Sequence, residues 1–295
     1  MVQKIYNSIM NKVNQIITDK IIEQLQAGKI PWKKAWAAGD FPKNIVTKKN
    51  YRGINTFILA MSDFSSPYWM TFKQCTELGG TIKKGSKSTQ VVFWQVTEYK
   101  TADQKEDDKE KTGLLLRYYN VFNLEQTEGI EAPVKPVHEF TPIEEAEKII
   151  AGYKDIPEIS FGGDRAYFAP TIDKLQMPKK NDFFSDEEYY STLFHELTHS
   201  TGSSKRLKRF ETEGYNHTFG SADYSKEELI AEMGASFLCA MSGITQPVLK
   251  NQAAYIQNWL GALKGDVSLV VSAGGKAQKA VDWITGNYPL DNVVK

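Results

Sequence analysis

The feature that most constrains this chain is the pentapeptide His-Glu-Leu-Thr-His, which begins at His195 and ends at His199. On an α-helix, residues four apart share one face, so both imidazoles can reach a single cation while Glu196 points at a water bound to it. The chain has only four histidines in 295 residues. At these residue frequencies the pattern is expected by chance about 0.004 times. The pentapeptide therefore predicts a helix that carries a metal site.

The residues around the pentapeptide predict a helix over residues 186–201. Asp186 is a suitable N-cap, and Gly202 stands where such a helix should stop. A catalytic zinc needs a third protein ligand and keeps one position for water. The metzincin pattern would supply that ligand as a histidine at position 205, but the chain has Lys205 there. A metzincin site is therefore excluded.

A carboxylate from a second helix is the remaining source of a third ligand. In a helix predicted over residues 225–242, Glu228 and Glu232 are four apart and share a face. The arrangement resembles the gluzincin helix, in which the first carboxylate binds the metal and the second orients a ligand histidine. On this resemblance we expect Glu228 as ligand and Glu232 as the supporting carboxylate, with Glu227 facing solvent. The alternative is that Glu228 and Glu232 are exposed helix charges.

In a catalytic site, Glu196 would act as general base towards a zinc-bound water, whose pKa the metal lowers to about 7. Tyr215, His217 and Tyr224 lie between the two predicted helices and are candidates for holding the developing oxyanion. His217 could equally be an ordinary surface histidine. A strand expected within residues 162–170 is either an edge strand along which an extended peptide docks or an ordinary sheet strand.

Charge is distributed unevenly along the chain. The whole sequence has 36 Lys plus Arg and 36 Asp plus Glu, so its formal net charge is zero. Residues 1–97 nevertheless hold 14 basic and 5 acidic residues, whereas residues 98–295 hold 22 basic and 31 acidic residues. A basic segment joined to an acidic one suggests that the first meets a polyanion, although a solvated basic face would give the same pattern.

Aromatic residues lie among the basic ones, because four of the six Trp fall within the first 97 residues. Single-stranded nucleic acid binds to a positive groove that follows the phosphates and to aromatic faces on which bases stack. No helix-turn-helix, zinc-finger or RRM signature supports base-specific reading of a duplex. For each Trp the alternative is packing in the core. The residues predicted to contact a strand are Lys48, Lys49, Arg52, Lys83, Lys84, Lys87, Trp32 and Trp36.

Apolar spacing predicts the remaining elements. A first helix ends near Gly28, because apolar residues recur every three or four positions before it. Residues 56–80 are predicted to be mostly helical, with a helix that starts at Trp69 and stops at two glycines. Two β-rich runs predict a hairpin with a charged tip. The predicted strands are 88–99, 114–124 and 165–168, and the other predicted helices are 143–153, 247–264 and 272–286.

Composition bounds the class of protein. Hydrophobic residues make up 41% and charged residues 24%, which is typical of a folded protein, and no apolar run reaches the roughly 18 residues of a membrane span. The two cysteines form no CxxC pair and the N-terminus lacks a secretory pattern, so a cytoplasmic protein is expected. The length suggests two domains. A proline-containing stretch at 128–138 predicts a linker, which places the domains at 1–135 and 136–295.

Several separate motifs resemble one protein family. Five segments of the first half resemble the N-terminal single-stranded-DNA-binding domain of the ArdC antirestriction proteins, a domain that TraC-type primases share. They are PWKKAW (31–36), NYRGINTFIL (50–59), WMTFKQCTELGGTIKKGSKS (69–88), VVFW (91–94) and YYNVFNLEQT (118–127). The zincin-like metallopeptidase domain that follows it in ArdC resembles GGDRAYFAP (162–170), HELTHSTG (195–202), KRLKR (205–209) and EELIAEMGASFL (227–238). The resemblance covers nearly the whole chain in the expected order.

The resemblance implies an α+β fold, with an N-terminal mixed α/β domain for single-stranded DNA and a mainly helical metallopeptidase domain of the gluzincin type with a small sheet. It implies a protein of a plasmid or other mobile element that protects incoming single-stranded DNA from host restriction during conjugation. A metal, zinc or another divalent ion such as Mn²⁺, is expected on His195, His199 and Glu228, with Glu196 as catalytic base. Host restriction-enzyme subunits are candidate peptide substrates. No membrane partner and no primase activity are expected.

Two alternatives to this interpretation differ in mechanism. The protein could coat single-stranded DNA without proteolysis and use the metal only for structure. The intact Glu196 argues against this, because a structural site needs no base beside its ligand. It could also mimic duplex DNA, as very acidic antirestriction proteins do. The net charge of zero argues against mimicry.

Overall fold

The computed structural model describes residues 2–33, 41–62, 64–99, 111–133, 142–211, 222–245 and 252–287. Within these ranges the α-helices are α1 (Val2–Gln26), α2 (Ile54–Ala60), α3 (Phe72–Glu77), α4 (Pro142–Gly152), α5 (Asp186–Ser200), α6 (Ala222–Ser242), α7 (Gln252–Gly265) and α8 (Leu269–Ile284). The strands are β1 (Lys43–Asn44), β2 (Tyr68–Met70), β3 (Thr81–Ile82), β4 (Thr89–Tyr99), β5 (Lys111–Asn123), β6 (Thr127–Glu128), β7 (Glu158–Phe161), β8 (Tyr167–Ala169) and β9 (Lys174–Met177).

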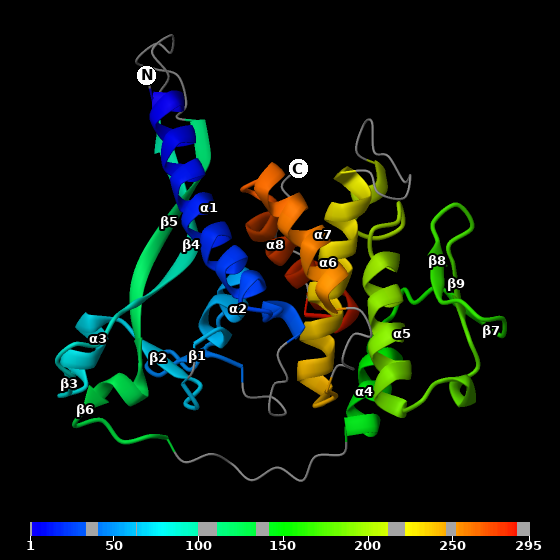
Figure 1. The fold of residues 1–295 in the computed structure, drawn as a ribbon, viewed down its shortest axis with the longest axis horizontal. Helices are drawn as coiled ribbons and strands as arrows, with labels where there is room; N and C mark the ends of the chain where they lie inside the picture. Colours follow the sequence, from blue (N-terminus) through cyan, green and yellow to red (C-terminus); the bar gives the residue numbers. More distant parts are fainter. Residues whose placement is uncertain are drawn as a thin grey trace.

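The N-terminal elements form a sheet beside a long helix. β4 and β5 pair antiparallel along their full lengths, from Thr89 opposite Val121 to Tyr99 opposite Lys111. β2 and β1 extend this sheet in the order β1-β2-β5-β4, and β3 pairs with β6 in a separate small sheet. α1 runs alongside the β4–β5 hairpin and contacts β5 (Figure 1). The two paired strands that the sequence predicts are confirmed, and the predicted charged tip at 100–110 lies outside the described residues.

The second half of the chain is mainly helical. α5, α6 and α8 pack on one another, and α4 packs on α6. A three-stranded sheet in the order β7-β9-β8 lies to the outside of α5 (Figure 1). The architecture is α+β, as the sequence predicts. None of the described helices combines the length and apolar character that crossing a bilayer requires.

One hydrophobic core joins elements from both halves of the sequence. Ile17 and Ile21 of α1 are buried together with apolar residues of α5, α6, α7 and α8. Phe57 of α2 stacks on Phe237 of α6, with ring centroids 4.7 Å apart. The first-half helices therefore complete the core of the helical second half. The domain boundary between residues 135 and 136 stays a prediction.

The helix predicted to start at Trp69 is wrong in its first residues. Trp69 lies in β2, where it pairs with Asn123 of β5, and all three residues of β2 are buried. The helix α3 begins only after Thr71, whose hydroxyl accepts a hydrogen bond from the backbone N–H of Gln74 in a capping box. Pairing with β5 and burial of both faces decide the conformation of this short apolar run, which periodicity cannot assign.

The predicted helix over residues 186–201 forms as α5, but its cap differs by one residue. Ser185, not Asp186, is the N-cap, and its hydroxyl accepts a hydrogen bond from the N–H of Glu188. Asp186, Glu187 and Glu188 then occupy the first turn. Acidic side chains there interact favourably with the positive end of the helix dipole. The Ser185 cap marks where α5 begins.

A glycine allows α5 and α6 to lie close together beside the histidines. A Cβ at Gly234 of α6 would fall 2.4 Å from Cγ2 of Thr198 on α5, and Thr198 is fully buried. The Thr198 hydroxyl donates to the carbonyl of Phe194 at 2.7 Å, so the side chain is held in place. The absence of a side chain at Gly234 therefore sets how closely the two helices approach.

We expect Gly234→Ala to push α6 away from α5 and to lower the free energy of unfolding by about 1–3 kcal/mol, as overpacking does. Gly275→Ala is the matched control, because Gly275 is also helical and a Cβ there meets nothing within 4 Å. Chemical denaturation of both variants measures the difference. Equal stability of the two variants would show that Gly234 does not limit the approach of the helices.

Candidate functional site

α5 brings the two histidines of the pentapeptide together. The Nε2 atoms of His195 and His199 are 3.1 Å apart, and their rings meet edge to face with centroids 4.7 Å apart. The opposite sides of α5 carry buried apolar residues, among them Leu193, Phe194 and Leu197. Burial of these residues fixes the rotation of the helix, so both imidazoles face α6.

Glu228 of α6 completes a set of three possible ligands. Its Oε2 lies 3.5 Å from Nε2 of His195, and its Oε1 lies 3.5 Å from Nε2 of His199. One ligand atom from each of the three residues lies within 4.8 Å of the others. Nitrogen and oxygen ligands sit about 2.0–2.2 Å from a zinc ion, so ligands of one ion are about 3–4 Å apart. The two imidazoles and the carboxylate therefore fit one divalent ion, and zinc and manganese both accept such ligands.

The electrostatics of the site favour a bound cation. Burial opposes ionisation of Glu228, but hydrogen bonds with His195 and His199 outweigh it and lower its pKa. Burial alone would lower the pKa of His199, whereas contacts with Glu227 and Glu228 and the charge of Glu196 raise it to about 10. The carboxylates thus stabilise positive charge at the position that the two imidazoles share.

Glu227 is not solvent-facing, contrary to the expectation from the sequence. It is 5% exposed, and its carboxylate accepts two hydrogen bonds from Arg209, at 2.6 and 3.0 Å. Its Oε1 also lies 3.4 Å from Nδ1 of His199. A carboxylate on the far nitrogen of a ligand histidine fixes the ring and its tautomer. Glu227 therefore makes the contact that the sequence predicts for Glu232.

Arg209 holds Glu227 in this position and is a site residue that sequence reasoning missed. Its guanidinium also donates to the carbonyl of Thr198 and to the hydroxyl of Thr201. The loop after α5 is thereby tied to the end of that helix. The sequence signal for a buried Glu227 was the composition of α6, because the apolar residues Leu229, Ile230 and Ala231 follow Glu228 directly. All three are buried in the structure, so the described part of α6 has no wide face exposed to solvent.

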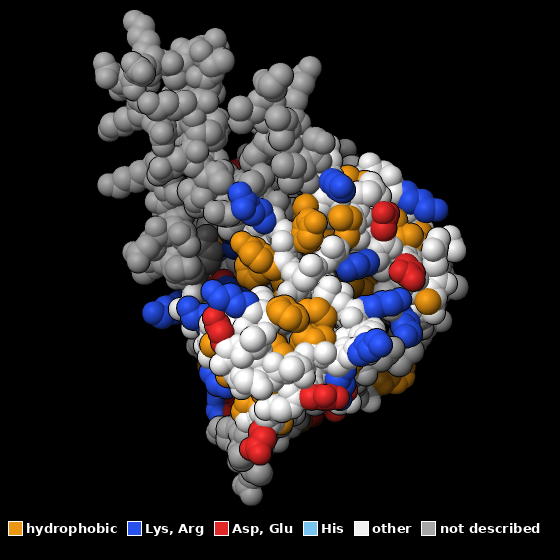
Figure 2. Space-filling model, turned by 90° about the vertical axis from the view of Figure 1, so that its left-hand side faces the viewer, with side chains coloured by type: hydrophobic (Ala, Val, Ile, Leu, Met, Phe, Trp, Pro, Cys, Tyr) orange, Lys and Arg blue, Asp and Glu red, His pale blue; other side chains and the backbone are white. Residues whose placement is uncertain are grey.

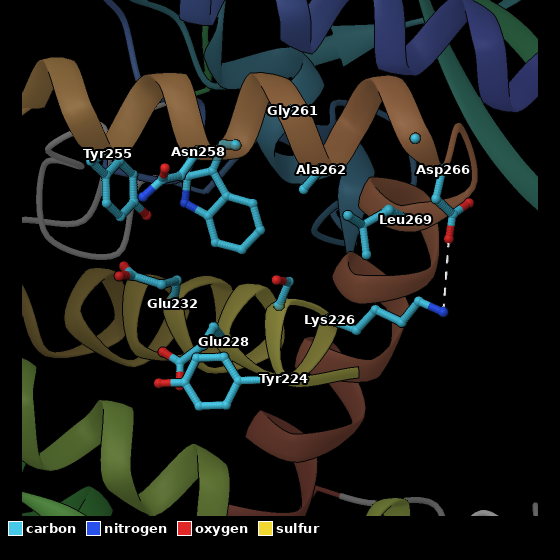
Figure 3. Close-up of a pocket in the computed structure, with 13 residues that line it drawn as sticks. Tyr224, Lys226, Glu228, Glu232, Tyr255, Asn258, Gly261, Ala262, Asp266 and Leu269 are labelled. Atoms are coloured by element: carbon cyan, nitrogen blue, oxygen red, sulfur yellow. Dashed lines mark ion pairs between the residues drawn. The ribbon is translucent and has the colours of Figure 1, made fainter. Parts of the chain in front are cut away.

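Glu232 lies one turn beyond Glu228 on α6 but faces another partner. Figure 3 shows its side chain opposite Tyr255 of α7, and a hydrogen bond between the two contributes to the raised pKa of Tyr255, after burial and the Glu232 charge. Both residues line a cavity between α6 and α7. Glu228 and Glu232, four residues apart on α6, thus contact different groups.

Tyr224 is the predicted oxyanion candidate that the structure places at the site. Its ring lies beside Glu228 (Figure 3). Burial, the charge of Glu228 and a hydrogen bond to that carboxylate raise the pKa of Tyr224 to about 12, so the phenol keeps its proton. The charge of Glu196 contributes to the pKa shifts of both Tyr224 and His199, and Glu196 is buried. Tyr215 and His217 lie outside the described residues.

The predicted role of Trp32 in stacking bases is wrong for this structure. Trp32 is fully buried, its Nε1 donates to the hydroxyl of Tyr255 at 2.9 Å, and its ring meets Trp259 edge to face. The indole thus fills the core between α1 and α7, where large aromatic side chains bury the most apolar surface. Trp36 lies outside the described residues.

The predicted basic residues lie on the surface of the N-terminal half. Lys48 has its Nζ 5.8 Å from the ring centroid of Tyr68, Lys83 donates to the carbonyl of Glu125, and Arg52 forms an ion pair with Asp282 of α8. Lys49, Lys84 and Lys87 are exposed. Figure 2 shows Lys and Arg side chains beside exposed apolar ones on this face, with fewer acidic side chains.

Sequence reasoning missed a pair of exposed aromatic residues, Phe93 and Tyr119, on one face of the β4–β5 hairpin. Phe93 and Tyr119 are 43% and 46% exposed, and their rings meet edge to face at 5.4 Å. The register places Arg117 opposite Phe93 and Val91 opposite Tyr119, so all four share one face of the hairpin. Val91 is buried at the base of that face. We call Phe93, Arg117 and Tyr119 the aromatic platform.

Comparison with known proteins places both halves of the chain. Residues 11–122 match the family model described as the N-terminal domain of anti-restriction factor ArdC, and residues 144–276 match that of a zincin-like metallopeptidase. Two crystal structures of the antirestriction ArdC protein from the R388 plasmid, one metal-free and one Mn(II)-bound, superpose with a TM-score of 0.74. They are 35% and 34% identical and cover 93% and 94% of this chain, which covers 97% and 98% of theirs.

Curated relatives differ more in length. An uncharacterized protein, y4eC of Sinorhizobium fredii (strain NBRC 101917 / NGR234), is 33% identical over 91% of this chain and 90% of its own length. A DNA primase TraC of Escherichia coli is 35% identical over 92% of this chain but only 20% of its own length. The chain thus spans about a fifth of that primase.

Because Glu227 orients His199, we expect Glu227→Gln to weaken binding of Zn²⁺ or Mn²⁺ by about 10- to 100-fold. Glu158→Gln is the control, because Glu158 is an exposed carboxylate of β7. Isothermal titration of metal-free protein measures both affinities, and thermal unfolding reports whether the loss of the Arg209 ion pair also destabilises the fold. A folded Glu227→Gln protein with unchanged metal affinity would show that Glu227 serves Arg209 alone.

Proposed function

The chain belongs to the ArdC family of antirestriction proteins, and we propose that it is a metallopeptidase that also binds single-stranded DNA and protects incoming plasmid or mobile-element DNA from host restriction. The observation that carries the peptidase proposal is the convergence of His195, His199 and Glu228 from two helices within 4.8 Å. The match to TraC covers a fifth of that primase, so the proposal does not include priming.

When bound, a divalent ion polarises the scissile carbonyl and makes water more acidic. The chain's own residues do the rest. His195, His199 and Glu228 would hold the ion, and Glu227, which lies 3.4 Å from Nδ1 of His199, would keep the Nε2 of that ring turned towards it. Glu196 takes a proton from the attacking water and delivers it to the leaving amine. Tyr224 keeps its proton at neutral pH, so it can donate a hydrogen bond to the developing oxyanion.

An extended peptide could dock along β8. This strand is at the edge of the β7-β9-β8 sheet and contacts α5, the helix with both histidines. An edge strand presents unpaired backbone donors and acceptors to which a peptide can add as a further strand. Of the two interpretations of residues 162–170, the position of β8 favours the docking strand. Subunits of the host restriction enzyme are the substrates that we propose.

Glu196→Gln tests whether chemistry is needed. The amide keeps the shape of the side chain but cannot take a proton, so we expect peptidase activity to fall by about 10²- to 10⁴-fold while metal content stays the same. Protection of DNA entering a restricting host should be lost in parallel. The readouts are cleavage of purified restriction-enzyme subunits and the efficiency of plasmid transfer.

The control for this variant is Glu187→Gln, which removes an exposed carboxylate from the first turn of the same helix. It should leave cleavage and protection unchanged. Full protection by a folded Glu196→Gln protein would support the alternative, in which the protein coats DNA and the metal is structural.

We propose that single-stranded DNA binds to the exposed basic residues of the N-terminal half and to the aromatic platform together. Phe93 and Tyr119 offer ring faces on a strand pair, and Arg117 stands beside them. Bases stack on exposed aromatic rings, and an arginine can pair with phosphate or stack on a base. Lys48, Lys49 and their basic neighbours supply the positive surface that follows a backbone.

We expect the double variant Phe93→Ala with Tyr119→Ala to weaken binding of an oligothymidylate by about 5- to 100-fold, because stacking contributes about 1–3 kcal/mol per base. Phe161→Ala is the control, since Phe161 is an exposed aromatic of the second half. Fluorescence anisotropy at several salt concentrations measures both. Wild-type protein should prefer single strands to duplex and bind more weakly as salt rises. Equal effects of the two changes would remove the platform from the interface.

A further inference from the structure

A cavity opens between α6 and α7 directly beside the three possible metal ligands. Its volume is about 900 Å³, within the size range of ligand pockets in proteins. Glu228 is part of its wall, so the cavity and the metal position adjoin (Figure 3). It is lined by Tyr224, Ser225, Lys226, Glu228, Glu232, Tyr255, Asn258, Trp259, Gly261, Ala262, Gly265, Asp266 and Leu269.

The two ends of the cavity differ in charge. At one end Lys226 lies 4.0 Å from Asp266, which balances their charges. At the other end Glu232 stands opposite Tyr255 of α7 (Figure 3), and Trp259, one helical turn further along α7, also lines the cavity. Between the ends, Ala262 and Leu269 provide apolar wall. Glu228 and Glu232, one helical turn apart on α6, both stand towards the end with Tyr255, so the carboxylates lie at the end of the cavity nearest the metal position (Figure 3).

Glu232 is held in place by a hydrogen-bond chain that starts in the N-terminal half. The indole N–H of Trp32 can only donate, and it donates to the Tyr255 oxygen at 2.9 Å. Burial and the negative charge of Glu232 raise the pKa of Tyr255, so its hydroxyl stays protonated and donates a hydrogen bond to Glu232. The ring of Trp32 also supports Trp259 edge to face at 5.8 Å. One buried tryptophan thus positions both the carboxylate and an aromatic wall.

We propose that this cavity binds a cationic side chain, arginine or lysine, of the peptide substrate next to the scissile bond. The proposal rests on the peptidase function proposed above and names its specificity. The charged head of such a side chain pairs with Glu232, and its methylene groups pack on the apolar part of the cavity wall. Trp259 adds a ring face, to which cations are attracted. A carboxylate can accept several hydrogen bonds, so one from Tyr255 leaves capacity for a guanidinium.

Other side chains fit the cavity less well. An acidic side chain would meet Glu228 and Glu232, and like charges repel at close range. A purely apolar side chain would displace water from Glu232 without offering a positive charge or a hydrogen bond in return, which is costly. Only a cationic side chain offers both methylene groups that pack on the apolar wall and a positive charge that pairs with the Glu232 carboxylate.

The test compares two peptides that differ by one charge. Acetyl-Ala-Arg-Ala-Ala amide and its citrulline counterpart have side chains of the same shape, but citrulline is neutral. Their affinities are measured by isothermal titration with metal-free wild-type protein and with metal-loaded Glu196→Gln protein, neither of which should cleave them. We expect the arginine peptide to bind about 10- to 100-fold more tightly. Equal affinities would overturn the proposal.

Two variants locate the preference. Glu232→Gln should reduce the arginine-to-citrulline affinity ratio to near one without weakening the citrulline peptide, whereas Glu187→Gln, at an exposed site on α5, should leave the ratio unchanged. Trp32→Phe removes the donor to Tyr255, and we expect it to lower the same ratio several-fold. A purely structural role for Trp32 would weaken both peptides equally. A ratio unaffected by Glu232→Gln would overturn the assignment to this cavity.

The outcomes separate this proposal from the peptidase proposal. A clear preference for arginine without any cleavage by the metal-loaded wild-type protein would keep the pocket and remove the peptidase function. Cleavage without such a preference would keep the peptidase function and remove the pocket. Both measurements use the full-length protein.

Discussion

The concentration of buried and half-buried carboxylates around two imidazoles is the constraint on which the site depends. Glu196, Glu227 and Glu228 all lie close to His199, and buried charges are costly unless they are compensated. Arg209 compensates Glu227 with two hydrogen bonds. The remaining negative charge falls on the position between the imidazoles, where a divalent cation fits. This arrangement depends on the rotation of α5, which its buried apolar residues fix, and on the close approach of α5 and α6 at Gly234.

Side-chain contacts join the two halves of the chain. α1 and α2 contribute to the core that also contains α5 to α8, and Arg52 forms an ion pair with Asp282 of α8. Trp32 reaches from the N-terminal half to Tyr255 and Trp259 at the wall of the cavity. A residue that looked suited to nucleic acid from its position in a basic segment therefore supports the site in the other half.

Local sequence patterns predicted most elements and the three residues, His195, His199 and Glu228, that the structure brings together as possible metal ligands. The His195 to His199 spacing is set by helix geometry alone, and the amphipathic helices and the hairpin follow from periodicity. The partner of His199 could not be predicted in the same way. Glu227 is adjacent to Glu228 in the sequence, and Glu232 follows one helical turn later. Only the packing of α6 against Arg209 and Tyr255 decides which carboxylate faces which group. Likewise, the exposure of Phe93 depends on where the covering elements end, which β4 itself does not encode.

The shared core has a consequence for inheritance. Ile17, Ile21 and Trp32 are buried against helices that come more than 150 residues later in the chain, so neither part keeps its interior when separated from the other. Recombination that exchanged one half for that of a distant relative would have to match side chains on both sides of this seam. The two halves are thus more readily inherited together than separately. The E. coli TraC primase carries a segment similar to 92% of this chain.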